Sequence, residues 1–401
     1  MRLLGLILAF SLVVSATKLA PIIIVPGLSA SVLDTRFHKT VPVPHAMCEK
    51  NVNSWKKIWV SLTEFAPEVV DCFMQTISPS YDAATSRYNN CPGVEIQPRD
   101  FGGVGGIYAA DPDIKGPTKF YGVMIDYLEK LGYKVGETIF GAPYDWRVSD
   151  PVANHHNGQY AALQTLVEQV VNQTGRRPHL IGHSLGSPFI HLFLATYTTQ
   201  EWRDQYVGSF ISLAGPLGGS PQAAEFAYCG LDWRIPGLTK TRLRDLTKHM
   251  GGVAWMMPYG PSADYTVIST PQANYTAATL AQMYADAGEE NTAAMVKSVQ
   301  TYLNKAAILP PGVETHLFYS LNTSTALTYT EPAGHACAKE GGVPIANRPG
   351  DDTVPDVSLL AFQHWLPQKQ ALHTYQVSDA HADIVKDPAV NQLIYEIANG
   401  L

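Results

Sequence analysis

The chain has 401 residues, of which 46% are hydrophobic and 16% charged, and its formal net charge is −7. This length fits one large enzyme domain with insertions, or two ordinary domains, and the composition allows a large buried core. The acidic balance gives no general basic surface, which argues against nucleic acid as a partner.

The N-terminus has the features of a secretory signal. A positive charge at Arg2 precedes an apolar run over residues 3–14, and small residues follow it. The run is too short to span a bilayer, so we predict a cleaved signal peptide over residues 1–16, with a signal anchor as the alternative. No later stretch reaches about 18 apolar residues, so no membrane span is expected. The mature chain, residues 17–401, is expected in the secretory pathway, secreted or in a lysosome-like lumen.

Sequons and cysteines agree with export. Three Asn-X-Ser/Thr sequons predict glycosylation at Asn172, Asn274 and Asn322. The five cysteines suit an oxidising compartment, and we predict that Cys48 pairs with Cys72, since the two bracket one short segment. Closing a loop of that size stabilises a fold by about 3 to 4 kcal/mol in the chain-entropy model.

The first expected element of the mature chain is a buried strand. Residues 20–25 form an apolar, mostly β-branched run, which is typical of a central parallel strand. The strand leads into Pro26, Gly27 and Leu28. In hydrolases built on a parallel sheet, a turn after such a strand supplies the second backbone amide of the oxyanion hole. We take the Leu28 amide as that donor, with an ordinary strand-to-loop turn as the alternative.

Residues 41–98 break the regular pattern. The segment holds several prolines, three cysteines and a run in which Trp55 and Trp59 flank two lysines. This composition is typical of a surface at the lipid headgroup boundary, with rings toward the acyl chains and ammonium groups toward water. We predict that residues 41–98 form a membrane-binding insertion that contacts lipid through Trp55 and Trp59. The alternative is that both rings belong to the core of a small subdomain.

Strand and helix patterns alternate through the rest of the chain. Apolar residues at helical spacing predict helices, and short apolar runs between turns predict strands. Helices are expected over residues 120–131, 161–171 and 388–398. Strands are expected over residues 207–213, 313–321 and 372–377, with another that leads to Gly141. Such alternation predicts an α/β fold with a mostly parallel central sheet.

One motif lies between a predicted strand and a predicted helix: Gly182-His183-Ser184-Leu185-Gly186. The G-x-S-x-G pattern is typical of a nucleophile elbow, in which a serine stands at a sharp turn. The two glycines let the strand and the helix approach closely. We predict Ser184 as the nucleophile and the Leu185 amide, at the helix start, as the first oxyanion donor. A chance match to the pattern is the alternative.

Residues 218–310 are irregular and rich in Gly, Pro, Met and aromatic residues. They follow the predicted strand at residues 207–213 and precede the last strands. We predict a cap or lid inserted into the sheet, of the kind that covers an apolar channel and excludes water from the reaction.

A serine nucleophile needs a histidine base that a carboxylate holds in place, and in this architecture the order is Ser, Asp or Glu, His. His381, between the last strand and the final helix, is the expected base. The acid is expected in a polar turn that contains Asp351 and Asp352, between which the pattern does not choose; Asp356 and Asp379 are weaker candidates. The chain has no H-E-x-x-H or paired C-x-x-C spacing, so neither a catalytic metal nor another cofactor is expected.

Several stretches together resemble one known family, lecithin:cholesterol acyltransferase with lysosomal phospholipase A2. The stretches are residues 25–27 (V-P-G), 141–147 (G-A-P-Y-D-W-R), 182–186, 212–219 (S-L-A-G-P-L-G-G), 350–354 (G-D-D-T-V) and His381. The A-P-Y-D-W-R stretch is far more specific than the serine motif. The separation of Cys48 and Cys72 also resembles the family's disulfide-closed membrane-binding loop. Residues 28–31 (L-S-A-S) and the lid depart from the family pattern, which bears on acceptor choice rather than on acyl-enzyme chemistry.

The resemblance implies an α/β-hydrolase fold with a small membrane-binding subdomain and a cap. It implies an enzyme that acts at a phospholipid membrane or lipoprotein-like surface, takes a fatty acyl chain from a glycerophospholipid, and passes it through an acyl-serine to water or a lipid alcohol. In the family's G-D-x-T-V motif the first acid is catalytic, which selects Asp351. Two other functions stay open: an esterase for other esters, and a non-catalytic lipid-binding protein on the same fold.

Overall fold

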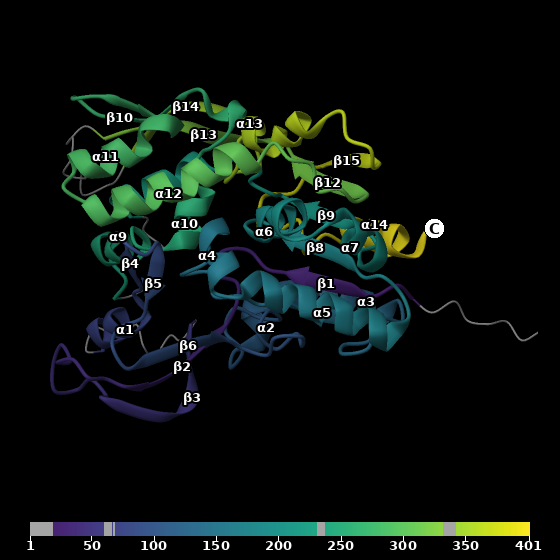
Figure 1. The fold of residues 1–401 in the computed structure, drawn as a ribbon, viewed down its shortest axis with the longest axis horizontal. Coiled ribbons are helices and arrows are strands. Elements are labelled where there is room, and N and C mark those ends of the chain that lie inside the picture. The colour runs from purple at the N-terminus through teal and green to yellow at the C-terminus, as the bar shows by residue number, and fades with distance from the viewer. Residues whose placement is uncertain (1–18, 60–65, 67–68, 231–236, 332–341) are drawn as a thin grey trace, which may run out of the picture.

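The computed structural model describes residues 19–59, 66, 69–230, 237–331 and 342–401 (Figure 1). The predicted signal peptide, residues 1–16, lies outside the described residues. Within the described ranges, no helix combines the length and the apolar character needed to cross a membrane.

A six-stranded sheet forms the centre of the molecule, in the order β15-β12-β9-β8-β1-β7. Every pair of neighbouring strands in it is parallel, so the predicted fold class is confirmed. The strands are β1 (Ile22–Val25), β7 (Ile139–Gly141), β8 (His179–His183), β9 (Phe210–Leu213), β12 (Thr315–Ser320) and β15 (Leu372–Val377). They lie close to the ranges expected from sequence.

Helices cover both faces of this sheet, which explains why β1 and β9 are buried along their whole length. Alternate residues of β1 point to opposite faces. Ile22 and Ile24 belong to a core with α3 (Tyr121–Lys130) and α14 (Pro388–Asn399), whereas Ile23 packs in the core of α5 and α6. The remaining helices around the sheet are α2 (Lys115–Thr118), α4 (Pro151–His156), α5 (Gln159–Thr174), α6 (Gly186–Leu192), which continues as one π-helical turn (Phe193–Tyr197), and α7 (Gln200–Tyr206).

A small subdomain lies at one end of the molecule, at the lower left of Figure 1. It contains a three-stranded antiparallel sheet in the order β3-β2-β6 and a separate two-stranded hairpin. Its elements are β2 (Leu33–His38), β3 (Asn51–Trp59), α1 (Val70–Ile77), β4 (Ser80–Asp82), β5 (Arg87–Asn89) and β6 (Val94–Pro98). The predicted disulfide between Cys48 and Cys72 is present and closes this subdomain.

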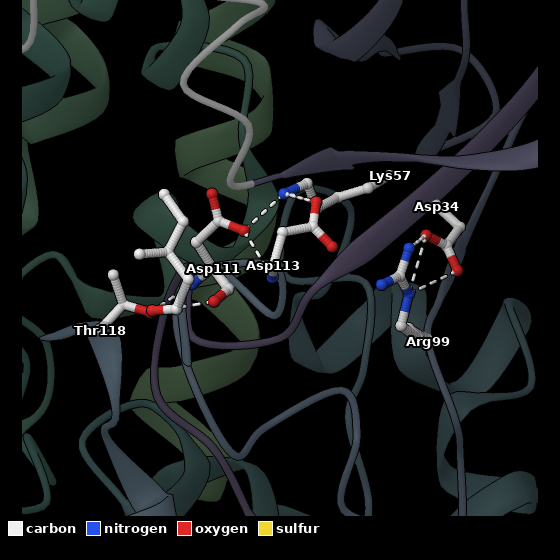
Figure 2. Close-up of polar contacts among 7 residues, drawn as sticks. Asp34, Lys57, Arg99, Asp111, Asp113 and Thr118 are labelled. Carbon is white, nitrogen blue, oxygen red and sulfur yellow. Dashed lines mark hydrogen bonds and ion pairs between the residues drawn. The ribbon is translucent and has the colours of Figure 1, made fainter. Parts of the chain in front are cut away.

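Ion pairs attach the small subdomain to the loop before α2 (Figure 2). The Lys57 ammonium, on β3, lies 2.5 Å from a carboxylate oxygen of Asp111 and 2.6 Å from one of Asp113. Arg99 pairs with Asp34 of β2 beside it. Because the Lys57 and Asp111 side chains are largely buried, with 12% and 5% exposed, this pair fixes the position of β3 more firmly than an exposed pair would.

A buried arginine in the A-P-Y-D-W-R stretch makes a second attachment. The Arg147 side chain is fully buried and forms an ion pair of 2.6 Å with Asp145. It also donates hydrogen bonds to the carbonyl oxygen of Ile77 (2.8 Å) and to Oδ1 of Asn90 (3.1 Å), both in the small subdomain. The stretch therefore holds the subdomain against the central sheet.

Trp59 lies in the interior, so the prediction that it contacts lipid is wrong for this arrangement. Only 3% of it is exposed, its ring centroid lies 5.2 Å from that of Trp146, and its indole N–H donates to the carbonyl oxygen of Ser29 (2.7 Å). The alternative, a core aromatic of a small subdomain, describes this residue. Trp55, on the same strand, is 37% exposed, with the Arg36 guanidinium 4.7 Å from its ring centroid.

A second layer lies beside the central sheet, at the top of Figure 1. It holds a four-stranded sheet in the order β11-β10-β13-β14 and a group of helices. Strands β13 and β14 lie beyond residue 310, so this layer extends past the range 218–310 that was expected to form the cap. Its elements are α8 (Pro221–Cys229), α9 (Lys240–Thr247), α10 (Gly251–Met256), β10 (Thr266–Ser269), β11 (Asn274–Thr276), α11 (Leu280–Asp286), α12 (Glu290–Ala306), β13 (Thr323–Thr330), β14 (Val343–Gly350) and α13 (Asp356–Leu359).

Candidate active site

Ser184 stands at a sharp turn between β8 and α6. Its φ is 51°, in the left-handed region that residues other than glycine rarely adopt. The flanking glycines allow the turn: a Cβ on residue 182 would lie 2.5 Å from the carbonyl oxygen of Gly186, and one on residue 186 would lie 2.2 Å from that of Val25. Both contacts are closer than atoms can approach, so only glycine fits these two positions.

Three side chains from distant parts of the sequence meet at this turn. Nε2 of His381 lies 2.9 Å from Oγ of Ser184, and Nδ1 of His381 lies 2.8 Å from Oδ2 of Asp351. An ionised carboxylate only accepts hydrogen bonds, so Nδ1 of His381 carries the proton and Nε2 accepts from the serine hydroxyl. This orientation leaves the basic nitrogen next to the hydroxyl that it would deprotonate.

The two neighbouring aspartates have different environments. Asp351 is 1% exposed, and its Oδ1 accepts hydrogen bonds from the backbone amides of Thr353 (3.1 Å) and Val354 (2.7 Å). Asp352 is exposed, with φ of 80°, and accepts from the Thr353 hydroxyl (2.7 Å). Asp351 therefore uses one carboxylate oxygen for the backbone amides of its loop and the other for the imidazole of His381.

A hydrogen-bonded chain lies behind the three side chains. Tyr121 Oη accepts from the Gly27 amide (2.8 Å) and lies 2.9 Å from Nδ1 of His183. Nε2 of His183 in turn lies 2.9 Å from the carbonyl oxygen of His381. Burial is the main cause that lowers the pKa of His183 to about 3, and the neighbouring His381 is the second. This ring is therefore neutral at physiological pH. Neither Tyr121 nor the role of His183 was predicted from the sequence, since no motif marks a buried relay.

The turn after β1 lies against Ser184, where the second oxyanion donor was predicted. A Cβ on Gly27 would lie 2.9 Å from Cβ of Ser184, so a larger residue would displace the nucleophile. Leu28 is half-buried and lines the same cavity as Ser184 and His381, and Leu185 is fully buried directly after the serine. The backbone amides of Leu28 and Leu185 thus belong to the two segments that flank Ser184, and their role as oxyanion donors stays a prediction.

The cavity beside Ser184 has a volume of about 190 Å³ and mostly apolar walls. Ala223 and Phe226 of α8 and Met256 of α10 are among the residues that line it. A larger cavity of about 370 Å³ lies between the small subdomain and α5, and no residue of the triad is among its described lining. We place the chemistry in the smaller cavity, because Ser184 and His381, a nucleophile and a base, both line it.

The predicted glycosylation sites lie at the surface, and the possible metal sites lie apart from the triad. Each predicted glycosylation position is exposed, at Asn172, Asn274 and Asn322, and their modification stays a prediction. The groups of side chains in the described residues that could hold a metal do not include a triad residue.

Comparisons with known proteins agree with the fold and the motifs. The chain matches the family model of lecithin:cholesterol acyltransferase over residues 55–388. It is 29% identical to lysosomal phospholipase A and acyltransferase of Rattus norvegicus over 377 residues (91% of this chain, 88% of the relative). It is 30% identical to phosphatidylcholine-sterol acyltransferase of Mus musculus over 372 residues (91% of this chain, 82% of the relative). A chain of the crystal structure of the Tle4-Tli4 complex shares the fold, with a TM-score of 0.56 at 11% identity, over 94% of this chain and 98% of that one. The chain therefore belongs to the lecithin:cholesterol acyltransferase family.

Proposed function

We propose that the chain is a serine lipid acyl hydrolase and O-acyltransferase. It removes a fatty acyl chain from a glycerophospholipid and passes it to water or to a lipid alcohol. The observation that carries the proposal is the pair of hydrogen bonds that links Ser184, His381 and Asp351 at the wall of an apolar cavity. The names of the two family relatives, a phospholipase with acyltransferase activity and a phosphatidylcholine-sterol acyltransferase, supply the substrate class.

In the first step, Oγ of Ser184 attacks the ester carbonyl of the phospholipid while Nε2 of His381 takes the hydroxyl proton. Asp351 holds the imidazole in the required tautomer and stabilises its positive charge. The amides of Leu28 and Leu185 donate to the oxyanion of the tetrahedral intermediate. His381 then returns the proton to the leaving oxygen, so the ester bond breaks, a lysophospholipid departs, and the acyl group is bound to Ser184.

In the second step, an acceptor hydroxyl attacks the acyl-serine, and His381 takes its proton and returns it to Oγ of Ser184. Water as the acceptor gives a free fatty acid, and a lipid alcohol gives a new ester. The apolar walls formed by α8 and α10 favour a lipid in the cavity and limit water beside the acyl-serine. We propose that both acceptors are used, with hydrolysis favoured when no lipid alcohol is present.

The small subdomain is the part of the chain that we propose meets the lipid surface. Trp55 is exposed on β3, and the Cys48–Cys72 disulfide closes the segment that contains it. Attachment through Lys57 and Arg147 keeps this surface fixed relative to the cavity. The proposed location is a secretory compartment, secreted or lysosome-like, and one relative is named a lysosomal enzyme.

The test uses vesicles of phosphatidylcholine labelled in the acyl chains, with and without a sterol or a short-chain ceramide. We expect free fatty acid without the alcohol, and an additional labelled ester when the alcohol is present. The variant Ser184→Ala should lose both products, whereas Ser80→Ala, an exposed serine on β4, should retain them. Hydrolysis of soluble short esters at the rate seen with vesicles would instead favour a general esterase. The absence of either product with the unaltered chain would favour a non-catalytic lipid-binding protein.

A further inference from the structure

A group of metal-ligand side chains lies at the end of the central sheet opposite Ser184. His316 of β12 and His373 of β15 are directly paired in the parallel register, and Glu314 directly precedes β12. Because all strands of the sheet are parallel and Ser184 follows the carboxyl end of β8, residues at the strand starts lie at the far edge. The group therefore has no part in the acyl-transfer site.

Both histidines lie as far from Glu314 as two ligands of one ion lie from each other, and all three ligand atoms lie within 4.8 Å of one another. Nε2 of His316 lies 3.4 Å from Oε1 of Glu314, and Nε2 of His373 lies 3.3 Å from the same oxygen. Two ligands that each lie about 2.0–2.1 Å from a tetrahedral zinc ion are about 3.3–3.4 Å apart, which matches both distances. We propose that Glu314, His316 and His373 form a binding site for Zn²⁺ or a similar divalent transition metal.

The surroundings of His316 suit a metal ligand. Tyr375 Oη lies 3.2 Å from Nδ1 of His316, so with a metal on Nε2 the ring proton on Nδ1 has an acceptor. The side chains of His373 and Glu314 are 45% and 50% exposed, which leaves a fourth position open to water.

Metal binding requires one side-chain rotation. The rings of His316 and His373 are 14° from parallel, with centroids 4.7 Å apart, so their lone pairs do not yet converge. His316 is held by burial and by Tyr375, whereas His373 is exposed and can turn about its Cβ–Cγ bond.

Two other groups in the described residues have ligand-type side chains, but both include disulfide-bonded sulfurs. Cys48 and Cys72 form a disulfide beside His45, and Cys229, beside Glu225 and Glu331, is also disulfide-bonded. A disulfide sulfur cannot act as a thiolate ligand. The group at Glu314 is therefore the one of the three that keeps all its ligand atoms.

The proposed metal would clamp the edge strand of the sheet. It joins β12 to the start of β15, and the far end of β15 leads to His381 four residues later. We therefore assign the metal a structural role, which appears as increased stability: an ion that binds only the folded state raises the melting temperature.

The test titrates the purified chain, freed of metal with a chelator, with Zn²⁺ by calorimetry and with Co²⁺ by visible absorption. We expect one ion per chain with the intense absorption of a four-coordinate cobalt site, and a raised melting temperature with Zn²⁺. His373→Ala and Glu314→Gln change exposed side chains, so both should fold, and each should weaken binding at least tenfold. His38→Ala, an exposed histidine on β2, is the matched control and should bind normally.

His381→Ala separates this site from zinc bound to the triad. Binding that persists in His381→Ala and is lost in His373→Ala supports the proposal. Binding that is lost in His381→Ala and unchanged in His373→Ala and Glu314→Gln overturns it, as does the absence of any bound Zn²⁺ in the unaltered chain.

Discussion

Nε2 of His183, the residue before the serine, donates a hydrogen bond of 2.9 Å to the carbonyl oxygen of His381. A carbonyl oxygen only accepts, so Nε2 of His183 carries the ring proton and Nδ1 must accept. Nδ1 therefore accepts from the Tyr121 hydroxyl, whose oxygen in turn accepts from the Gly27 amide. The turn after β1, the elbow and the loop of the base are thus connected by one chain of hydrogen bonds with a single consistent direction.

Tyr121→Phe interrupts this chain with the loss of one oxygen atom. The buried Gly27 amide and Nδ1 of His183 lose their partner, which should destabilise the fold by about 1–3 kcal/mol. A small displacement of the base should also lower kcat by up to about 100-fold with little change in KM. Steady-state kinetics on labelled vesicles and thermal unfolding measure both effects.

Tyr127→Phe is the matched control, because Tyr127 lies on the same helix and bonds Gln392 away from the elbow. It should retain kcat within about twofold. Equal losses in the two variants would assign the effect of Tyr121→Phe to α3 as a whole and contradict the positioning role.

Asp351 and Asp352 provide a test within one loop. Asp351→Asn keeps the shape of the side chain but favours the wrong tautomer of His381, so kcat should fall by about 10⁴-fold. Asp352→Asn changes an exposed side chain that contacts only its own loop in the described structure, and kcat should change by less than about threefold. Comparable losses in both variants, or a larger loss in Asp352→Asn, would show that the acid has been misassigned.

We predict that the free energy of unfolding falls as pH rises, because two glutamates in the second layer are buried. Ligand atoms of Glu225 on α8 and of Glu331 after β13 lie within 4.8 Å of each other, and both residues are almost fully buried. Burial is the main cause that raises the pKa of Glu225 above its ordinary range, and the charge of Glu331 is the second. Among the described residues, Lys240, Tyr228, Tyr284 and Tyr329 also interact electrostatically with this pair, and the backbone amide of Gly342 donates a hydrogen bond to Glu225.

The sign follows from proton linkage. The folded chain keeps a proton that the unfolded chain releases above about pH 4.5, so this contribution is fully present below that pH and is lost as pH rises toward the raised pKa. The loss for one proton is at most about 1.4 kcal/mol for each pH unit. In Glu225→Gln this slope should disappear between pH 5 and 7, as measured by denaturant unfolding. Glu129→Gln, an exposed residue of α3, should keep the wild-type slope. An unchanged slope in Glu225→Gln would contradict the prediction that the folded chain keeps this proton at the buried glutamates.

Variants of Trp55 and Trp59 distinguish a residue that contacts the membrane from one that packs in the core. Trp55→Ala should weaken binding to phosphatidylcholine vesicles and leave the melting temperature nearly unchanged, because its ring is exposed. Trp59→Ala should destabilise the fold by about 3–5 kcal/mol, because it removes a buried ring. Vesicle sedimentation and thermal unfolding check the pair. Unaltered sedimentation of Trp55→Ala would place the lipid surface elsewhere on the chain.

The elbow and the parallel sheet could be predicted from sequence because their signals are local. Continuous apolar runs mark strands buried on both faces, and glycines at 182 and 186 are required by contacts that no other residue tolerates. The acid could be narrowed only to Asp351 or Asp352 from local pattern. What separates them is the folded loop, in which Oδ2 of Asp351 lies 2.8 Å from Nδ1 of His381, whereas Asp352 has a left-handed φ of 80° and an exposed side chain.

Other features depend on tertiary packing and left no local signal. Strand β14 escaped prediction because it contains prolines and nearly all of it is exposed, so no apolar alternation marks it. Its partner β13 consists mostly of Thr and Ser and has few apolar residues. The same limit applies to Trp59: a tryptophan beside lysines has the pattern of a surface residue, and the rings of Trp146 and Phe73, which are distant in sequence, make the position a core one.

The most direct test of Ser184 as the nucleophile is the position of a covalent label. The chain is treated with a fluorophosphonate, digested and analysed by mass spectrometry, in parallel with acyl release from labelled phosphatidylcholine vesicles. We expect a single label on Ser184, blocked by prior incubation with vesicles, and no acyl release in Ser184→Ala. A label on a different residue, or a Ser184→Ala variant that still releases acyl chains at the wild-type rate, would contradict it.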